Sequence, residues 1–290
     1  MIKEFDVYNK FTQTEEKITT EYINVSNSFG ELLLPRDYVP RQFGGNVEDI
    51  EGDVGNLAAN RLLSKQIIAH GVKHLQANSV VIDVGAHMGT MSMMYSKFLG
   101  IKGGGEIIAI EASPQNFVCV KHNIELNSPP NVKVTCMNAI CYSQASEGTK
   151  MMFPVHDKTT EKLTGQYGIT NSLESQQVHK VPVITIDSLN LSNVSLIKID
   201  AEGADLHVLK GAQKTIQKFK PAIIIELIGD GQNYLAGLRG PEIKQMIAER
   251  PKGDRDSIEE VFKVFNQIMP KGWKGQNIHN HHEAIFYWEE

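Results

Sequence analysis

The sequence predicts an α/β fold in which a mostly parallel sheet carries helices on both faces. Short apolar, β-branched runs alternate with stretches of helical apolar spacing, as expected for parallel strands joined by helices. Each run ends at or beside an acid or an amide, and a glycine turn follows the first of them. The predicted strands of this sheet cover residues 80–84, 106–110, 132–137, 196–199 and 222–225.

The composition excludes several classes of protein. The chain has 290 residues and a net charge of −5 with no block of like charges, so tight sequence-independent nucleic-acid binding is not expected. No uncharged apolar stretch approaches the length that spans a membrane. The first ten residues lack the apolar segment of a secretory signal, and the three cysteines form no C-x-x-C pair. We therefore expect a cytoplasmic protein with no membrane partner, and the oligomeric state stays open.

The first 56 residues are predicted to form an N-terminal extension, and residues 57–290 the principal domain. Alternating polar and apolar residues up to position 35 predict two or three short strands or a hairpin. Residues 35–55 are rich in proline, glycine and acids, which is typical of a long loop. Such a loop is either a substrate lid or a plain surface excursion, and the sequence favours neither.

The first strand of the sheet leads into the segment D-V-G-A-H-M-G-T, residues 83–90. A buried strand, a glycine turn and a helix in that order bring bare backbone and a helix N-terminus close to a ligand. A dinucleotide fingerprint would have three glycines directly after the strand and its acid about twenty residues later. Asp83 instead precedes the turn, where it suits a cationic ligand without phosphates, such as S-adenosylmethionine (SAM). The alternative is an ordinary turn between a strand and a helix.

The next two strands also end in polar side chains. Glu111 ends the second strand, and a carboxylate there can accept hydrogen bonds from both hydroxyls of a ribose. Asn138 ends the third, where an amide could donate to and accept from an adenine edge; an amide in a strand-end turn is the alternative. The predicted cofactor site is therefore formed by Asp83, Gly85, Ala86, His87, Gly89, Thr90, Glu111, Ala112, Asn138, Ala139 and Asp200.

Two further strands complete the set of carboxylates. Residues 196–199 run into Asp200 and Glu202, and residues 222–225 run into Glu226. A carboxylate near a core is unfavourable unless it is used, so packing alone does not explain the whole set. Parallel strands of one sheet present their carboxyl ends at the same edge, so we expect these acids to lie close together.

These stretches resemble the FkbM-type family of SAM-dependent methyltransferases. The similarity lies in V-I-D-V-G-A-H-M-G-T, I-A-I-E-A-S-P, T-I-D-S-L, I-K-I-D-A-E-G-A-D-L-H-V-L-K-G-A and P-A-I-I-I-E-L, between Val80 and Leu227. It implies a Rossmann-like class I methyltransferase fold with a seven-stranded sheet, SAM as cofactor, and O-methylation of a hydroxyl, often on a sugar or polyketide. The family often has asparagine where this chain has His87.

The resemblance and the topology place the catalytic residues on the acceptor side of this edge. Asp200 or Glu202 is the candidate base that takes the hydroxyl proton, and Glu226 is a further candidate. The same carboxylates could instead orient the acceptor or hold a divalent cation. A glycan or other small-molecule acceptor is expected. The alternatives are methylation of RNA or protein, and a non-catalytic binding module with the same fold.

Overall fold

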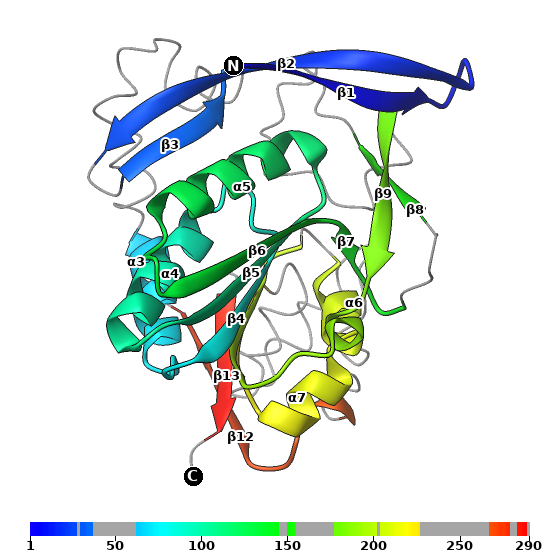
Figure 1. The fold of residues 1–290 in the computed structure, drawn as a ribbon. Helices are drawn as coiled ribbons and strands as arrows, with labels where there is room; N and C mark the ends of the chain where they lie inside the picture. The colour runs from blue at the N-terminus through cyan, green and yellow to red at the C-terminus, as the bar shows by residue number, and fades with distance from the viewer. Residues whose placement is uncertain are drawn as a thin grey trace.

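The structure is a computed structural model that describes residues 1–27, 30–36, 62–144, 150–154, 177–201, 204–226, 267–278 and 283–288. These residues form two sheets with helices packed against them (Figure 1). No helix within these ranges is both long enough and apolar enough to cross a membrane.

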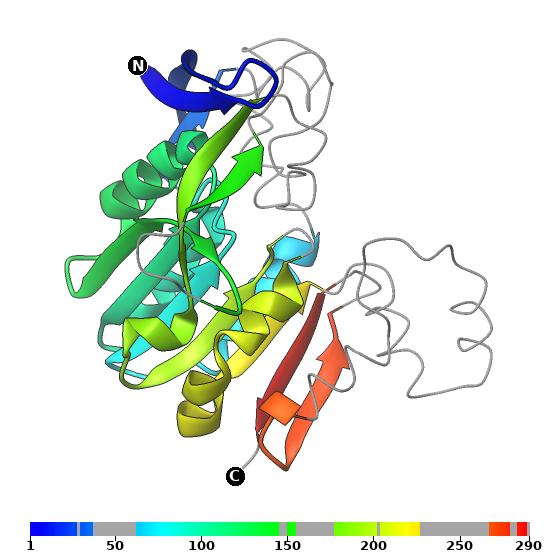
Figure 2. The same ribbon diagram turned by 90° about the vertical axis from the view of Figure 1, so that its right-hand side faces the viewer.

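The larger sheet has seven strands in the order β12-β13-β11-β10-β4-β5-β6. Parallel pairing joins all neighbours from β11 to β6, whereas β13 is antiparallel to both β11 and β12. Figure 2 shows β12 and β13, in orange and red, at one edge. The strands are β4 (Ser79–Val84), β5 (Gly105–Glu111), β6 (Val132–Asn138), β10 (Val194–Ile199), β11 (Ala222–Glu226), β12 (Trp273–Asn277) and β13 (Glu283–Trp288). This confirms the predicted seven-stranded, mostly parallel sheet.

Helices cover both faces of this sheet, as predicted. One face packs against α3 (Leu62–Val72), α4 (Thr90–Lys102) and α5 (Pro114–Asn127), through Ile67, Leu99 and Val120 among others. The other face packs against α6 (Asp205–Lys210) and α7 (Gln213–Phe219), with the short 3-10 helix η2 (Ile186–Leu189) beside them. Because both faces are covered, all six residues of β4 are buried, which explains the unbroken apolar run at residues 80–82.

The smaller sheet combines the N-terminal strands with a later part of the chain. It contains β1 (Ile2–Asn9), β2 (Thr14–Asn27), β3 (Gly30–Pro35), β7 (Ile140–Cys141), β8 (Lys150–Pro154) and β9 (Gln177–Ile184), with β1 pairing antiparallel to β9. The strands predicted before residue 35 are thus confirmed. Because the extension shares a sheet with residues beyond position 56, strand pairing does not separate it from the rest of the chain. The predicted domain boundary at residue 56 stays a prediction. Most of the predicted loop at residues 35–55 lies outside the described residues.

Candidate functional site

The carboxyl ends of β4, β5, β10 and β11 lie side by side and bring the predicted acids to one edge of the larger sheet. Lys198 of β10 is in register with Asp83 of β4, and Ile199 with Ile225 of β11. Asp200 and Glu226, the next residues, therefore lie next to each other across two neighbouring strands. The topology confirms that four of the predicted acids, Asp83, Glu111, Asp200 and Glu226, gather at this edge.

The glycine turn after β4 is fixed by close backbone contacts. Gly85 has a φ of +73°, and a Cβ atom there would lie 1.7 Å from the carbonyl oxygen of Asp200. The N–H groups of Gly85 and Ala86 both donate to the carbonyl of Ile110, at 2.9 and 3.1 Å. Gly89 is the N-cap of α4 with a φ of +81°, so no side chain caps this helix. Only glycine combines such a φ with so close an approach of backbone to backbone.

Asp83 lies inside the sheet rather than at its surface. Its side chain has no exposed surface; one oxygen, Oδ2, accepts a hydrogen bond from Ser92 Oγ at 2.6 Å, and the other lies 3.4 Å from Lys198 Nζ. Direct contact between Asp83 and a cationic ligand therefore stays a prediction. In this structure the carboxylate orients Lys198 and ties β4 to α4.

Lys198 joins two of the predicted acids. Its side chain is only 6% exposed, and its ammonium donates a hydrogen bond to Asp200 Oδ2 at 3.1 Å while facing Asp83. Burial alone would lower the pKa of Lys198, but the two carboxylates together raise it above its ordinary value. The lysine therefore carries its charge, and the three side chains form a carboxylate–ammonium–carboxylate row from the sheet interior to its edge.

Asp200 stands at the outer end of this row, and its side chain is 36% exposed. Burial raises the pKa of Asp200, whereas the charge of the Lys198 ammonium and its hydrogen bond to Asp200 lower it. A hydrogen bond with Glu226 and the nearby His87 lower it further, so the pKa of Asp200 lies below its ordinary value. Two carboxyl groups share a hydrogen bond only when one of them holds a proton, and Asp200 is the one whose pKa is lowered. The result is a partly exposed carboxylate, held in its ionised form, beside the Glu226 carboxyl group.

Glu111 binds the glycine turn. Its Oε2 accepts a hydrogen bond from the backbone N–H of His87, and its Oε1 accepts one from Ser113, both at 2.8 Å. Burial raises the pKa of Glu111 to about 7, although these two hydrogen bonds oppose the shift. Each oxygen keeps a second lone pair, so the carboxylate could still accept the two hydroxyls of a ribose. That contact stays a prediction.

The third strand, β6, contributes structural hydrogen bonds at the same edge. The Asn138 amide nitrogen donates hydrogen bonds to the backbone carbonyls of Glu111 and Ala112, at 2.8 and 3.0 Å. The backbone N–H of Ala139 also donates to the carbonyl of Glu111, at 3.2 Å. Because the amide hydrogens are already donated, an adenine contact would have to use the amide oxygen. Thr90 is the first residue of α4, directly after the turn.

Two further hypotheses for this edge concern a second candidate base and a divalent cation. Glu202, the other candidate base, is not among the described residues. The described ranges contain no group of three or more His, Cys, Asp or Glu side chains that could bind a metal ion, so the alternative of a divalent cation has no support from them.

Sequence reasoning missed the contribution of Lys198, although a usable signal was present. A lysine between isoleucines in a fully buried strand needs counter-charges, and acids stood at the ends of the neighbouring strands. The T-I-D-S-L motif proved structural: Asp187 accepts hydrogen bonds from the backbone N–H groups of Lys214 and Thr215 at the start of α7.

Comparison with known proteins points to one family. Residues 83–250, more than half of the chain, match the family described as methyltransferase FkbM domain. No curated protein matches the sequence.

Several solved methyltransferases have distant structural similarity. A methyltransferase FkbM from Methylobacillus flagellatus is 14% identical, with a TM-score of 0.43; the match covers 73% of this chain and 44% of that protein, less than half its length. A precorrin-6y C5,15-methyltransferase from Geobacter metallireducens is 12% identical, with a TM-score of 0.40 and coverages of 79% and 93%. An SAH-bound methyltransferase from Podospora anserina is also 12% identical, with a TM-score of 0.40 and coverages of 89% for both chains.

Proposed function

Because this chain belongs to the methyltransferase FkbM family, we propose that it transfers the methyl group of SAM to a hydroxyl of a sugar, glycan or other small molecule. The observation that carries the proposal is the row of Asp83, Lys198 and Asp200, which ends in an ionised carboxylate beside the glycine turn. Packing does not require such a row, and an ionised carboxylate at this place suits a reaction that releases a proton.

The residues around the turn fit SAM. The N-terminus of α4 carries no side-chain cap, so its first N–H groups are available to the carboxylate of the methionine moiety. Glu111 lies against the turn, where its carboxylate can accept the ribose hydroxyls. When bound, SAM supplies an electrophilic methyl group on a sulfonium centre.

Asp200 would orient the acceptor and take its proton. Its ionised oxygen accepts a hydrogen bond from the acceptor hydroxyl and so directs an oxygen lone pair toward the methyl group. As the O–C bond forms and the S–C bond breaks, the hydroxyl proton becomes far more acidic than a carboxylic acid. A carboxylate of low pKa can therefore accept it, and Lys198 keeps Asp200 ionised until it does. The hydrogen bond from Glu226 would help to stabilise this ionised form.

Titration calorimetry with SAM and S-adenosylhomocysteine (SAH), followed by transfer of labelled methyl to a panel of sugars and glycans, tests the proposal. We expect the wild type to bind both ligands. Asp200→Asn should keep SAH affinity within about threefold and lose at least about a hundredfold in methyl transfer. Glu106→Gln is the matched control, because Glu106 lies at the opposite end of β5, paired with Lys133.

Each arm of this experiment can fail separately. Absence of binding at millimolar SAM would overturn the assignment of the cofactor. Binding with transfer only to RNA or protein would overturn the acceptor class. Full activity of Asp200→Asn would remove this carboxylate from the mechanism.

A further inference from the structure

A single buried asparagine connects the N-terminal extension to the glycine turn. Asn123 of α5 has no exposed surface. Its Oδ1 accepts a hydrogen bond from the N–H of Leu33 in β3 at 2.6 Å, and its Nδ2 donates to the carbonyl of Leu33 at 3.1 Å. The same Nδ2 donates to the carbonyl of Met88, inside the turn, at 2.9 Å. The amide thus pairs with a backbone segment of the extension in the manner of a neighbouring strand and contacts the turn at the same time.

The contact with Met88 fixes one peptide group of the turn from both sides. Asn123 binds the carbonyl of the Met88–Gly89 peptide, and the N–H of that peptide donates to the carbonyl of Ala86 at 2.7 Å. The residues on either side of Met88, namely His87 and Gly89, have φ values of +55° and +81°. Left-handed backbone at a non-glycine residue such as His87 is costly, so it persists only where neighbouring groups hold it.

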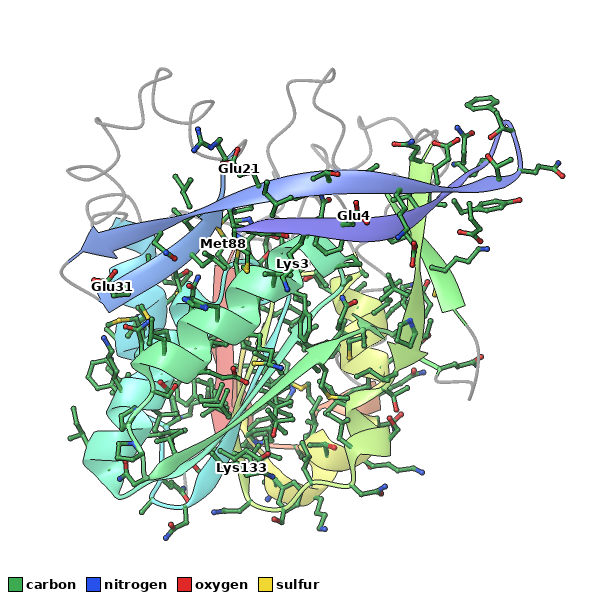
Figure 3. All side chains as sticks on the ribbon, turned by 45° about the horizontal axis from the view of Figure 1, so that its top comes forward. Lys3, Glu4, Glu21, Glu31, Met88 and Lys133 are labelled. Carbon is green, nitrogen blue, oxygen red and sulfur yellow. The ribbon has the colours of Figure 1, made fainter. Side chains whose placement is uncertain are left out.

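The Met88 side chain is held by the extension as well. It is buried in a cluster that includes Tyr22 of β2 and Leu32, Leu33 and Leu34 of β3. Figure 3 shows Met88 beneath the N-terminal strands. Tyr22 adds a hydrogen bond from its hydroxyl to the carbonyl of Gln115 in α5, at 2.9 Å. The extension is therefore docked on the helix that carries Asn123 and on the turn itself.

We propose that Asn123 is a positioning residue through which the N-terminal extension holds the glycine turn in its cofactor-binding form. The inference rests on the proposed function, because it takes this turn to be where SAM binds. It assigns the extension a role in cofactor affinity, distinct from the role of substrate lid that the sequence leaves open for residues 35–55.

Asn127 provides a matched control one helical turn further along α5. Its Nδ2 donates to the carbonyl of Glu31 in β3 and to that of Asn123, both at 2.8 Å. It therefore also joins α5 to the extension by a side-chain amide, but no hydrogen bond links it to the turn among the described residues. Comparison of the two positions separates docking of the extension from control of the turn.

The experiment compares Asn123→Ala, Asn123→Asp and Asn127→Ala with the wild type, by SAH titration well below their unfolding temperatures. Asn123→Asp keeps the volume and the oxygen that accepts from Leu33 while removing the amide donor, so it covers the case in which the alanine variant does not fold. We expect both Asn123 variants to bind SAH about tenfold more weakly, and Asn127→Ala to stay within about twofold of the wild type. Hydrogen–deuterium exchange without ligand should speed up at residues 85–89 in the Asn123 variants alone.

Two results would overturn the inference. Wild-type SAH affinity in Asn123→Asp would show that the amide does not control the turn. An equal loss in Asn127→Ala would show that docking of the extension, rather than the contact with Met88, sets affinity. If the wild type itself does not bind SAH, the proposed function fails first, so the two failures are distinguishable.

Discussion

Replacement of Lys198 by methionine should destabilise the protein more than any exposed ion-pair variant. Methionine nearly fills the volume of the lysine side chain but leaves Asp83, which has no exposed surface, without its counter-charge. Removal of one partner from a buried pair costs about 3–5 kcal/mol, because the other charge stays buried. The hydrogen bond from Ser92 to Asp83 remains in the variant, so we expect the lower half of this range.

Lys133→Met is the matched control. Lys133 forms an ion pair with Glu106 at 2.9 Å on the same sheet, but its side chain is 71% exposed. It lies at the far end of the sheet from Met88 (Figure 3). Exposed pairs contribute about 0–1 kcal/mol, so this variant should unfold almost as the wild type does.

Urea unfolding, with the free energy extrapolated to water, measures both variants. Asp83→Asn and the double variant Asp83→Asn/Lys198→Met complete a double-mutant cycle. We expect the double variant to be at least about 2 kcal/mol more stable than the sum of the single losses predicts, because it leaves no buried charge unpaired. A Lys198→Met variant within about 1 kcal/mol of the wild type, or an additive cycle, would refute the reasoning.

Two further predictions concern the glycine turn. Ribose hydroxyls donate to the ionised form of Glu111, so SAH binding should lower its pKa; titrations from pH 5.5 to 8 should show affinity rising with pH up to about 7 and levelling off above it, and Glu111→Gln should abolish that rise. A pH-independent affinity in the wild type would contradict this. Gly85→Ala should cost more than about 3 kcal/mol in unfolding free energy, because its Cβ meets the Asp200 carbonyl. Gly272→Ala, with a φ of +90° and nothing within 4 Å of its Cβ, should cost only about 1–2 kcal/mol; equal losses would show that backbone strain alone acts at Gly85.

The larger sheet could be predicted because its signals are local. Each buried strand is a short apolar run, and residues 80–84 and 196–199 need no distant partner to be identified as strands. The smaller sheet could be predicted only in part. The alternating pattern before residue 35 indicates strands, but it does not say that Tyr8 pairs with Val178, 170 positions away. No turn sequence or period encodes such a pairing, since it depends on how the extension packs against α5.

The candidate site, too, could be predicted only in part from the sequence. Residue type and strand position predicted that Asp83, Glu111, Asp200 and Glu226 would gather at one edge, because parallel topology dictates it. The protonation states of these acids depend on depth and on cross-strand register, which the sequence does not state. Asp83 lies one position inside the edge, in register with a lysine, and so becomes a buried counter-ion.

Asp200 lies two positions beyond that lysine, so the same ammonium keeps a partly exposed carboxylate ionised. A shift of one residue in the register between β4 and β10 would place Lys198 opposite Val84, an apolar side chain. The charge on Asp200 therefore depends on the register between β4 and β10, and the apolar residues of these strands do not reveal that register. The I-K-I-D segment is then a single electrostatic unit, in which the lysine lowers the pKa of the acid that follows it.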